Sequence, residues 1–433
     1  MSWYISSENQ HCEEPTSEML APQWKPSSAG RLKRCRRKRR GLVGCRAESG
    51  EVPSLTGSAA GDVLALLGTQ YLLRAPPGPL AGAVDSLTQN IVEPLIDLLC
   101  LPLRGCSFST ETRLGSGSFG TVYKATSSRS QPIVVKTPRK GNQAAELQNA
   151  EEILCRRIRR AARARRAVPD FIGKYCGTTP GSNSADPDAP NVLCWRADGD
   201  FTLEELLEDK RFLERAEELV YKGEVTCSPE RQKRAVKSLM RQAVSCVAAL
   251  HEAGIAHRDV KPAHFICERK SGRLVLVDLG ACVDLRNGFN FTPGEGVLDP
   301  RYGPPEGAVF PESVPPPPPP PLGTLLAPIL FWRYRPTLFD SYSLGLLIVQ
   351  LATPALRLTQ SFDKRSTFSQ RLRFADYDFA SMQKSNAENF ELLREKWKLG
   401  WDGIDLVSKL VCDRSRRISA RKALAHPFLA LPP

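Results

Sequence analysis

The stretch HRDVKPAHF, residues 257–265, is followed closely by LVLVDLG, residues 274–280, and the pair decides the fold. The first reads as a polar loop that carries Asp259 and, two residues later, Lys261. The second reads as a buried strand that ends in Asp278, where a carboxylate can bind a divalent cation. A buried strand with a polar end is common by itself. Both motifs in this order, 19 residues apart from Asp259 to Asp278, are not expected by chance.

Upstream of these motifs, LGSGSFGTV (114–122) contains the spacing G-x-G-x-x-G. A valine and a second strand follow the last glycine, whereas a dinucleotide-binding fold would continue into a helix. The pattern therefore predicts a hairpin whose backbone amides approach nucleotide phosphates. The residues of this loop expected at the nucleotide are Leu114, Gly115, Gly117, Ser118, Phe119, Gly120 and Val122.

Lys136 ends the apolar run IVVK, which is an unusual place for a surface lysine. A lysine so placed resembles one found in protein kinases, which implies contact with nucleotide phosphates and a pairing with a glutamate of the next helix, predicted within 144–166. Glu146, Glu151 and Glu152 are the candidates, and Glu151 has the best spacing.

Farther along, APNVLCWRADGDFTLEELL (189–207) predicts a buried strand, a short crossover and a helix. The backbone groups of Trp195, Ala197 and Asp198 are where an adenine is expected to bind.

Three downstream residues have predicted structural roles. Glu306 in RYGPPE and Arg417 in RRISARKALAHPFL are expected to form a buried ion pair. Asp340 stands at the start of an apolar helix, where its carboxylate can accept backbone amides of the loop around Asp259.

The formal net charge is +13, and much of it sits in RLKRCRRKRR (31–40) and RRIRRAARARR (156–166). For 156–166 the favoured interpretation is a solvated helix end whose cations suit the helix dipole. Binding to an acidic protein or an anionic membrane surface is the functional alternative. A nucleic-acid-binding protein ranks last, because no aromatic residues are interleaved with either run and no nucleic-acid module is recognised.

The 433 residues divide by composition. Residues 1–50 are polar and basic, 51–106 are rich in Gly, Ala and Leu, and 107–430 show a small sheet-bearing part followed by a larger helical part. Within the latter, 307–336 is a proline-rich insertion with seven consecutive prolines, 315–321. Such a run favours polyproline II and predicts a surface excursion, either a spacer or a dock for a proline-reading partner.

The 13 cysteines are scattered without any CxxC, which favours a reducing compartment over a disulfide framework. No membrane span is visible, because no uncharged apolar run in the N-terminal third approaches the roughly 20 residues that a span needs. The segment 91–103 is expected to be a short amphipathic helix that packs on the domain or on a membrane surface.

Together these motifs resemble the eukaryotic protein kinases over roughly 109–430. The resemblance implies an α+β, bilobal protein kinase fold with a small β-rich N-terminal lobe and a larger helical C-terminal lobe. It also implies an ATP- and Mg²⁺-dependent Ser/Thr kinase. In such an enzyme Asp259 orients the substrate hydroxyl, Lys261 steadies the transferred phosphoryl group, and Lys136 contacts the α- and β-phosphates. Asp278 and the residue at His264 would hold the metal ions.

The stretches WRADGDFTL (195–203) and LVDLGACVDLRNGFNFTPGEGVLDPRYGPPE (276–306) are similar to the thylakoid Ser/Thr kinases of plants and algae. Those are the enzymes of state transitions and of photosystem II phosphorylation. The similarity implies a thylakoid-associated chloroplast enzyme whose substrates are light-harvesting or photosystem subunits. The membrane anchor and lumenal cysteine pair of the state-transition branch are not recognised, so redox control is not carried over. The branch of the photosystem II core kinase fits equally well.

The N-terminal composition bears on localisation. Between Met19 and Ala47 there is no acidic residue, which is typical of a transit peptide. The alternative is a nuclear or nucleic-acid-binding basic run, and hence a nuclear or cytoplasmic protein. The sequence does not indicate the oligomeric state.

His264 departs from the family pattern, which has an asparagine at this position. Mg²⁺ prefers oxygen ligands, whereas an imidazole nitrogen suits Mn²⁺ and other transition metals better. One interpretation is a slower kinase with a weakened second metal site, for which Mn²⁺ is the alternative cofactor. The other is a pseudokinase that binds nucleotide and acts as a scaffold.

Overall fold

The computed structural model describes residues 108–116, 120–127, 130–138, 148, 151–158, 175–179, 192–197, 199, 201–284, 294, 299–316, 322–385 and 400–430, together with Gly68. The predicted basic segment 1–50 lies outside the described residues, and so does the extension 51–106 apart from Gly68.

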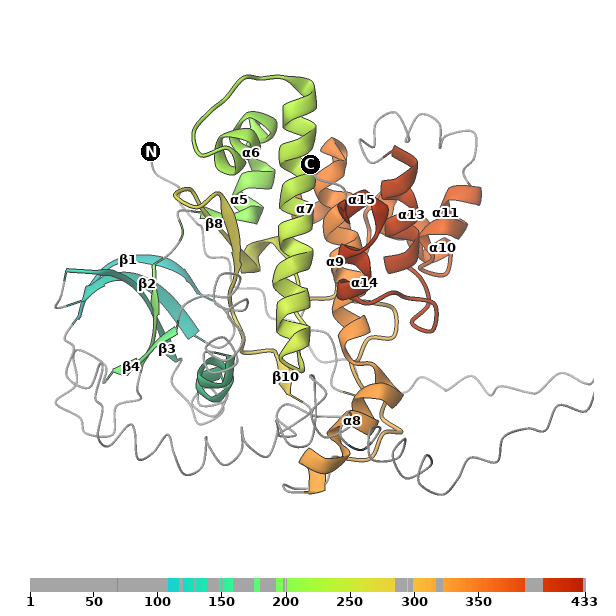
Figure 1. Ribbon diagram of the computed structural model, residues 1–433, viewed down its shortest axis with the longest axis horizontal. Helices are drawn as coiled ribbons and strands as arrows, with labels where there is room; N and C mark the ends of the chain where they lie inside the picture. The colour runs from blue at the N-terminus through green and yellow to red at the C-terminus, as the bar shows by residue number, and fades with distance from the viewer. Residues whose placement is uncertain are drawn as a thin grey trace, which may run out of the picture. The chain divides into compact units, whose positions relative to one another are not determined.

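Five antiparallel strands form the N-terminal sheet, in the order β1-β2-β3-β5-β4 (Figure 1). Their bounds are β1 Phe108–Ser116, β2 Gly120–Ser127, β3 Pro132–Pro138, β4 Tyr175–Thr179 and β5 Val192–Arg196. The runs TVYKA and PIVVK thus lie in β2 and β3, as their β-branched residues predict. Ala125, Val135, Val192 and Cys194 pack into one small apolar cluster of this sheet.

The helical part begins after β6 (Phe201–Thr202). A capping box starts α5 (Leu203–Glu208): the Thr202 hydroxyl accepts a hydrogen bond from the Glu205 amide, and the Glu205 carboxylate accepts one from the Thr202 amide. The next helices are α6 (Phe212–Val220) and α7 (Pro229–Glu252), which has a proline in its first turn.

Short strands carry the predicted motifs across the face of α7. These are β7 Ile255–Ala256, β8 Phe265–Glu268, β9 Arg273–Leu276 and β10 Val283–Asp284, with a 3₁₀ turn at Pro262–His264. The sheet β6-β8-β9 and the pair β10-β7 hold the loops that contain Asp259 and Asp278 between them.

The remaining helices complete the C-terminal part. They are α8 Leu322–Tyr334, α9 Thr337–Ala352, α10 Thr367–Phe374, α11 Phe379–Ser385, α13 Gly400–Leu410, α14 Ala420–Leu424 and α15 Pro427–Ala430, with 3₁₀ turns at Pro354–Leu356 and Thr359–Phe362. All residues of α9 are buried, and α9 lies beside α7 (Figure 1). A helix that is apolar on all sides belongs in a core, and this pair forms the centre of the main apolar cluster.

This is the α+β organisation that the sequence predicts, with a sheet followed by helices. Within the described part of the chain, no helix combines the length and the apolar character needed to cross a membrane. Part of the predicted proline-rich insertion 307–336 is helical, since α8 lies within it and begins directly after the proline run.

Candidate active site

Three elements converge on the amino group of Lys136. The lysine lies on β3, and its Nζ is 2.7 Å from Glu151 Oε2 and 3.0 Å from Asp278 Oδ1. Glu151 comes from the helical residues 151–158, and Asp278 follows β9. Of the three candidate glutamates, Glu151 is the one that the structure places at Lys136. Glu152 instead pairs with Arg156, and Glu146 lies outside the described residues.

Burial and charge act in opposite directions in this cluster. Burial lowers the pKa of Lys136, but Asp278 and Glu151 more than compensate, so it is raised above its usual value. Burial raises the pKa of the Glu151 carboxyl against the attraction of Lys136. Burial also acts to raise the pKa of Asp278, but the charge of Lys136 and its hydrogen bond hold that pKa well below its usual range. A charged lysine beside an ionised Asp278 is therefore the stable state at neutral pH.

The backbone at Asp278 has φ +62°, in the left-handed region. Aspartate tolerates this region better than most residues other than glycine. The carboxylate lies between two partners, since Oδ1 contacts Lys136 while Oδ2 is 3.4 Å from His264 Nε2.

Asp259 lies in the predicted loop beside Lys261, whose Nζ is 2.9 Å from Asp259 Oδ2. The same Nζ is 3.8 Å from Asp299 Oδ2, so the lysine stands between two carboxylates. Arg301 donates to both oxygens of Asp299 at 2.9 and 2.8 Å. Burial acts to raise the pKa of Asp299, but Arg301 lowers it below its usual value. Asp299 is thus a second carboxylate partner of Lys261, besides Asp259.

The two structural predictions for the downstream residues are confirmed. Asp340 Oδ2 accepts the amide of His257 at 2.7 Å, and Oδ1 accepts that of Arg258 at 2.8 Å. Arg417 forms a two-pronged pair with Glu306, at 2.7 and 3.0 Å. The first contact fixes the loop that carries Asp259, and the second fixes the end of the segment that follows Asp299.

The hydrogen bonds of His264 define the state of its ring. Nδ1 is 2.9 Å from the backbone oxygen of Asp259, and a carbonyl oxygen only accepts, so Nδ1 carries a proton and donates it. Burial lowers the pKa of His264, which favours the neutral ring. Nε2 therefore presents a lone pair toward Asp278 Oδ2.

The donors at this point fit a divalent cation that accepts nitrogen. One imidazole nitrogen and one carboxylate oxygen, 3.4 Å apart, suit Mn²⁺ better than Mg²⁺, which prefers oxygen. Among the described residues, no group of three His, Cys, Asp or Glu side chains forms a metal cluster. A metal held here would thus take its remaining ligands from water and from nucleotide phosphate.

The glycine-rich hairpin is described at its two strands. Gly115 pairs with Val122 across β1 and β2, and the side chain of Leu114 is largely exposed. Gly120 is close to the neighbouring strand, because a Cβ atom there would lie 2.6 Å from the Thr137 carbonyl oxygen. The loop residues Gly117, Ser118 and Phe119 lie outside the described residues.

The predicted adenine segment begins in β5, which lies between β3 and β4 in the same sheet. Trp195 is part of β5, and the amide of Ala197 donates to the Pro132 carbonyl at 3.2 Å. An adenine that used this amide would have to displace that bond. Asp198 lies outside the described residues.

The solvated interpretation of the arginine run is wrong for Arg157, which is 1% exposed. It forms an ion pair with Asp284 and donates to the Ala253 carbonyl at 2.6 Å. Since both partners come from the helical part, Arg157 ties the helix that carries Glu151 to β10 and the end of α7. Nothing in the run itself distinguishes this arginine from its neighbours.

Comparison with known proteins agrees with this geometry. Residues 202–311 match the family described as protein kinase domain. The chain is 34% identical over 389 residues to serine/threonine-protein kinase STN7, chloroplastic, of Arabidopsis thaliana. That match covers 86% of this chain and 65% of STN7, slightly less than two thirds of the relative's length.

It is also 31% identical over 399 residues to serine/threonine-protein kinase STN8, chloroplastic, of the same plant, covering 83% of this chain and 78% of STN8. The crystal structure of a Stt7 homolog from Micromonas algae soaked with ATP is similar with a TM-score of 0.63 and 25% identity. That match covers 75% of this chain and 92% of the other. The chain therefore belongs to the family of serine/threonine protein kinases that contains STN7 and STN8.

Proposed function

We propose that this kinase transfers the γ-phosphate of ATP to Ser or Thr residues of light-harvesting or photosystem proteins in the chloroplast, in association with the thylakoid. The observation that carries the proposal is the contact of Lys136 with both Glu151 and Asp278. It brings the sheet and the helical part together at the place where nucleotide phosphates would lie. The chloroplast location and the substrates are inferred from the names of the two plant relatives.

The residues have distinct tasks in such a transfer. Asp259, beside Lys261, would orient the substrate hydroxyl and receive its proton. Lys261 would then be free to face the transferred phosphoryl group, because Asp299 balances its charge from the other side. Lys136 would hold the α- and β-phosphates.

Asp278 and His264 are the residues that would hold a divalent cation. When bound, the ion neutralises charge on the β- and γ-phosphates. His264 supplies one neutral nitrogen where an asparagine would supply one oxygen, so the protein's contribution to Mg²⁺ binding is weaker.

A phosphotransfer assay with purified light-harvesting polypeptides tests the proposal. We expect wild-type protein to be more active with Mn²⁺ than with Mg²⁺, and His264→Asn to raise the Mg²⁺ rate by about 10- to 100-fold. Asp259→Asn is the inactive control. If neither metal supports transfer and His264→Asn does not restore it, the protein is a nucleotide-binding scaffold.

A further inference from the structure

Helix α8 is apolar on nearly all of its faces and is only partly covered. Its sequence, LGTLLAPILFWRY, contains a single charged residue, Arg333. A helix of this composition is normally buried in a core or in lipid. In α8, however, Leu322, Ile329 and Trp332 are 52%, 51% and 72% exposed.

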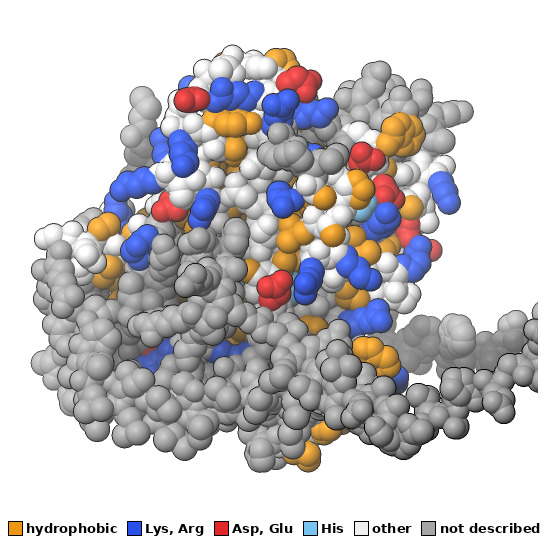
Figure 2. All heavy atoms as spheres, viewed as in Figure 1, with side chains coloured by type: hydrophobic (Ala, Val, Ile, Leu, Met, Phe, Trp, Pro, Cys, Tyr) orange, Lys and Arg blue, Asp and Glu red, His pale blue; other side chains and the backbone are white. Residues whose placement is uncertain are grey.

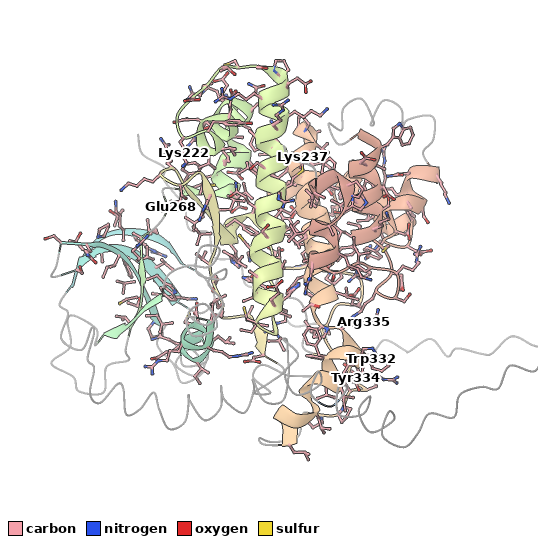
Figure 3. All side chains as sticks on the ribbon, in the orientation of Figure 1. Lys222, Lys237, Glu268, Trp332, Tyr334 and Arg335 are labelled. Carbon is pink, nitrogen blue, oxygen red and sulfur yellow. The ribbon has the colours of Figure 1, made fainter. Side chains whose placement is uncertain are left out.

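The covered and the exposed residues of α8 lie on different faces. Phe331 and Tyr334 pack against a small cluster of the kinase domain, where Tyr334 meets Phe310 edge-to-face at 6.1 Å between ring centroids. At 100° per residue, Leu322, Ile329 and Trp332 fall within about 80° of one another on the other side. Figure 3 labels Trp332, Tyr334 and Arg335 at the C-terminal end of the helix.

The helix is held firmly at that end. The Arg414 side chain donates to the Tyr334 carbonyl at 2.7 Å and to the Arg335 carbonyl at 3.3 Å. These bonds satisfy carbonyl oxygens that a helix terminus leaves without partners. Arg335, with φ +44°, then turns the chain into α9. The exposed apolar face is therefore presented by a fixed element of the domain.

The charged residues of α8 and of the chain on either side of it have one sign. No Asp or Glu occurs from residue 313 to residue 339, and both Arg333 and Arg335 are exposed. An indole and aliphatic side chains beside arginines form the pattern that enters the interface of a bilayer with anionic headgroups. Figure 2 shows hydrophobic side chains at the lower edge of the view, where Figure 1 places α8.

We propose that α8 is a membrane-surface dock, with Leu322, Ile329 and Trp332 inserted among lipids and Arg333 and Arg335 on anionic headgroups. The 13 residues of α8 span about 20 Å, too short to cross a hydrocarbon core of about 30 Å. Two copies of the chain that met through this face would bring their arginines together, which disfavours a dimer contact. The dock rests on the thylakoid association in the proposed function but not on phosphotransfer, so a failure of vesicle binding leaves the catalytic proposal intact, and an inactive protein leaves the dock intact.

Vesicle sedimentation of the full chain tests the dock. The vesicles would be neutral, or would contain roughly one third phosphatidylglycerol as the anionic lipid. We expect preferential binding to the anionic vesicles, a fall on the order of ten-fold in partitioning for Trp332→Ser, and a fall of about five-fold per charge for Arg333→Gln and Arg335→Gln.

The matched control is Trp401→Ser, since Trp401 is 67% exposed on α13 and should be without effect. All variants keep the basic run 31–40, which attracts anionic lipid by itself. The effect of Trp332→Ser is therefore also measured at about 0.5 M salt, where exposed charges are screened to within a few ångströms.

Three results would overturn the dock. The first is equal partitioning of wild type, Trp332→Ser and the arginine variants. The second is a self-association, seen by analytical ultracentrifugation, that Trp332→Ser abolishes while vesicle binding is unchanged. The third is normal vesicle binding by Trp332→Ser with lost binding to solubilised light-harvesting polypeptides, which would assign the face to a protein partner.

Discussion

At the residue scale, the site is built from opposed charges held out of water. Lys136 is 12% exposed and contacts two carboxylates, so its removal leaves Glu151 and Asp278 facing each other without a cation. Without the lysine, each carboxylate acts to raise the pKa of the other, and the carboxylate that would serve the metal is compromised.

We therefore expect Lys136→Met to lower kcat/KM for phosphotransfer by at least 10²–10³-fold, because a group that stabilises transferred charge is lost. Steady-state kinetics with a saturating protein substrate would measure the change. Lys124→Met is the matched control, since Lys124 is an exposed lysine on the adjacent strand β2. Equal losses in both variants would mean that the effect is not specific to the cluster.

Asp340 is the residue whose charge stabilises the loop around Asp259. It accepts the amides of His257 and Arg258 and is 2.7 Å from His251 Nε2. Burial acts to raise the pKa of Asp340, but the hydrogen bonds and nearby histidines lower it below the usual value of about 3.9. Its contribution to stability is thus complete above about pH 5 and is lost as the pH falls through the lower, folded-state value.

Because the pKa of Asp340 is lowered in the folded protein, its charge stabilises the fold at pH 7. We expect Asp340→Asn to lower the free energy of unfolding at pH 7 by about 2–4 kcal/mol, because one buried amide loses its acceptor. The difference between variant and wild type should shrink as the pH falls below about 4. Urea unfolding at pH 7, 5 and 4 would show it, with the exposed Asp376→Asn as control. A difference that stays constant with pH would exclude a role for the charge.

At the element scale, Arg157 decides where the helix that carries Glu151 sits. The arginine and Asp284 are 1% exposed each, so each neutralises the other away from water. A buried pair adds little compared with an apolar pair of the same size, but breaking it leaves an uncompensated charge.

Arg157→Met should therefore destabilise the fold by about 3–5 kcal/mol, and Arg157→Met with Asp284→Leu should recover most of that loss. Chemical denaturation of the single and double variants measures both numbers. Arg156→Met, one position away and partly exposed beside Glu152, should cost less than about 1 kcal/mol. If the double variant is as unstable as Arg157→Met alone, the loss does not come from the unpaired charge of Asp284.

The same elements show how far sequence reasoning reaches. Asp259, Lys261 and Asp278 could be placed because their spacing and the buried strand before Asp278 are local features of the chain. Arg157 could not, because its partner lies far along the chain and only the fold brings them together. Helix α8 could not be predicted from the sequence for a related reason. Seven prolines precede it, and the residues that it packs against, Phe310 and its neighbours, are brought to it by the fold.

At the scale of the whole molecule, nucleotide binding and the free energy of unfolding are thermodynamically linked. The sheet contributes Lys136 and the helical part contributes Asp278 and His264, so a nucleotide bound with its metal at the proposed site would hold both parts together. The histidine at position 264 is visible in the sequence. That its Nε2 faces Asp278 with a free lone pair is not, because the bond from Nδ1 to the Asp259 carbonyl sets the ring.

A non-hydrolysable ATP analogue should therefore raise the free energy of unfolding by about 2.7 kcal/mol at 100 times its Kd. At equal analogue concentration the increment should be larger with Mn²⁺ than with Mg²⁺ for wild type, because His264 offers nitrogen. The preference should reverse in His264→Asn and vanish in Lys136→Met, where the cluster around Asp278 is lost. Calorimetric unfolding with each metal, and with chelator as control, measures this without turnover. Identical increments for both metals in wild type and in His264→Asn would show that position 264 does not contact the ion.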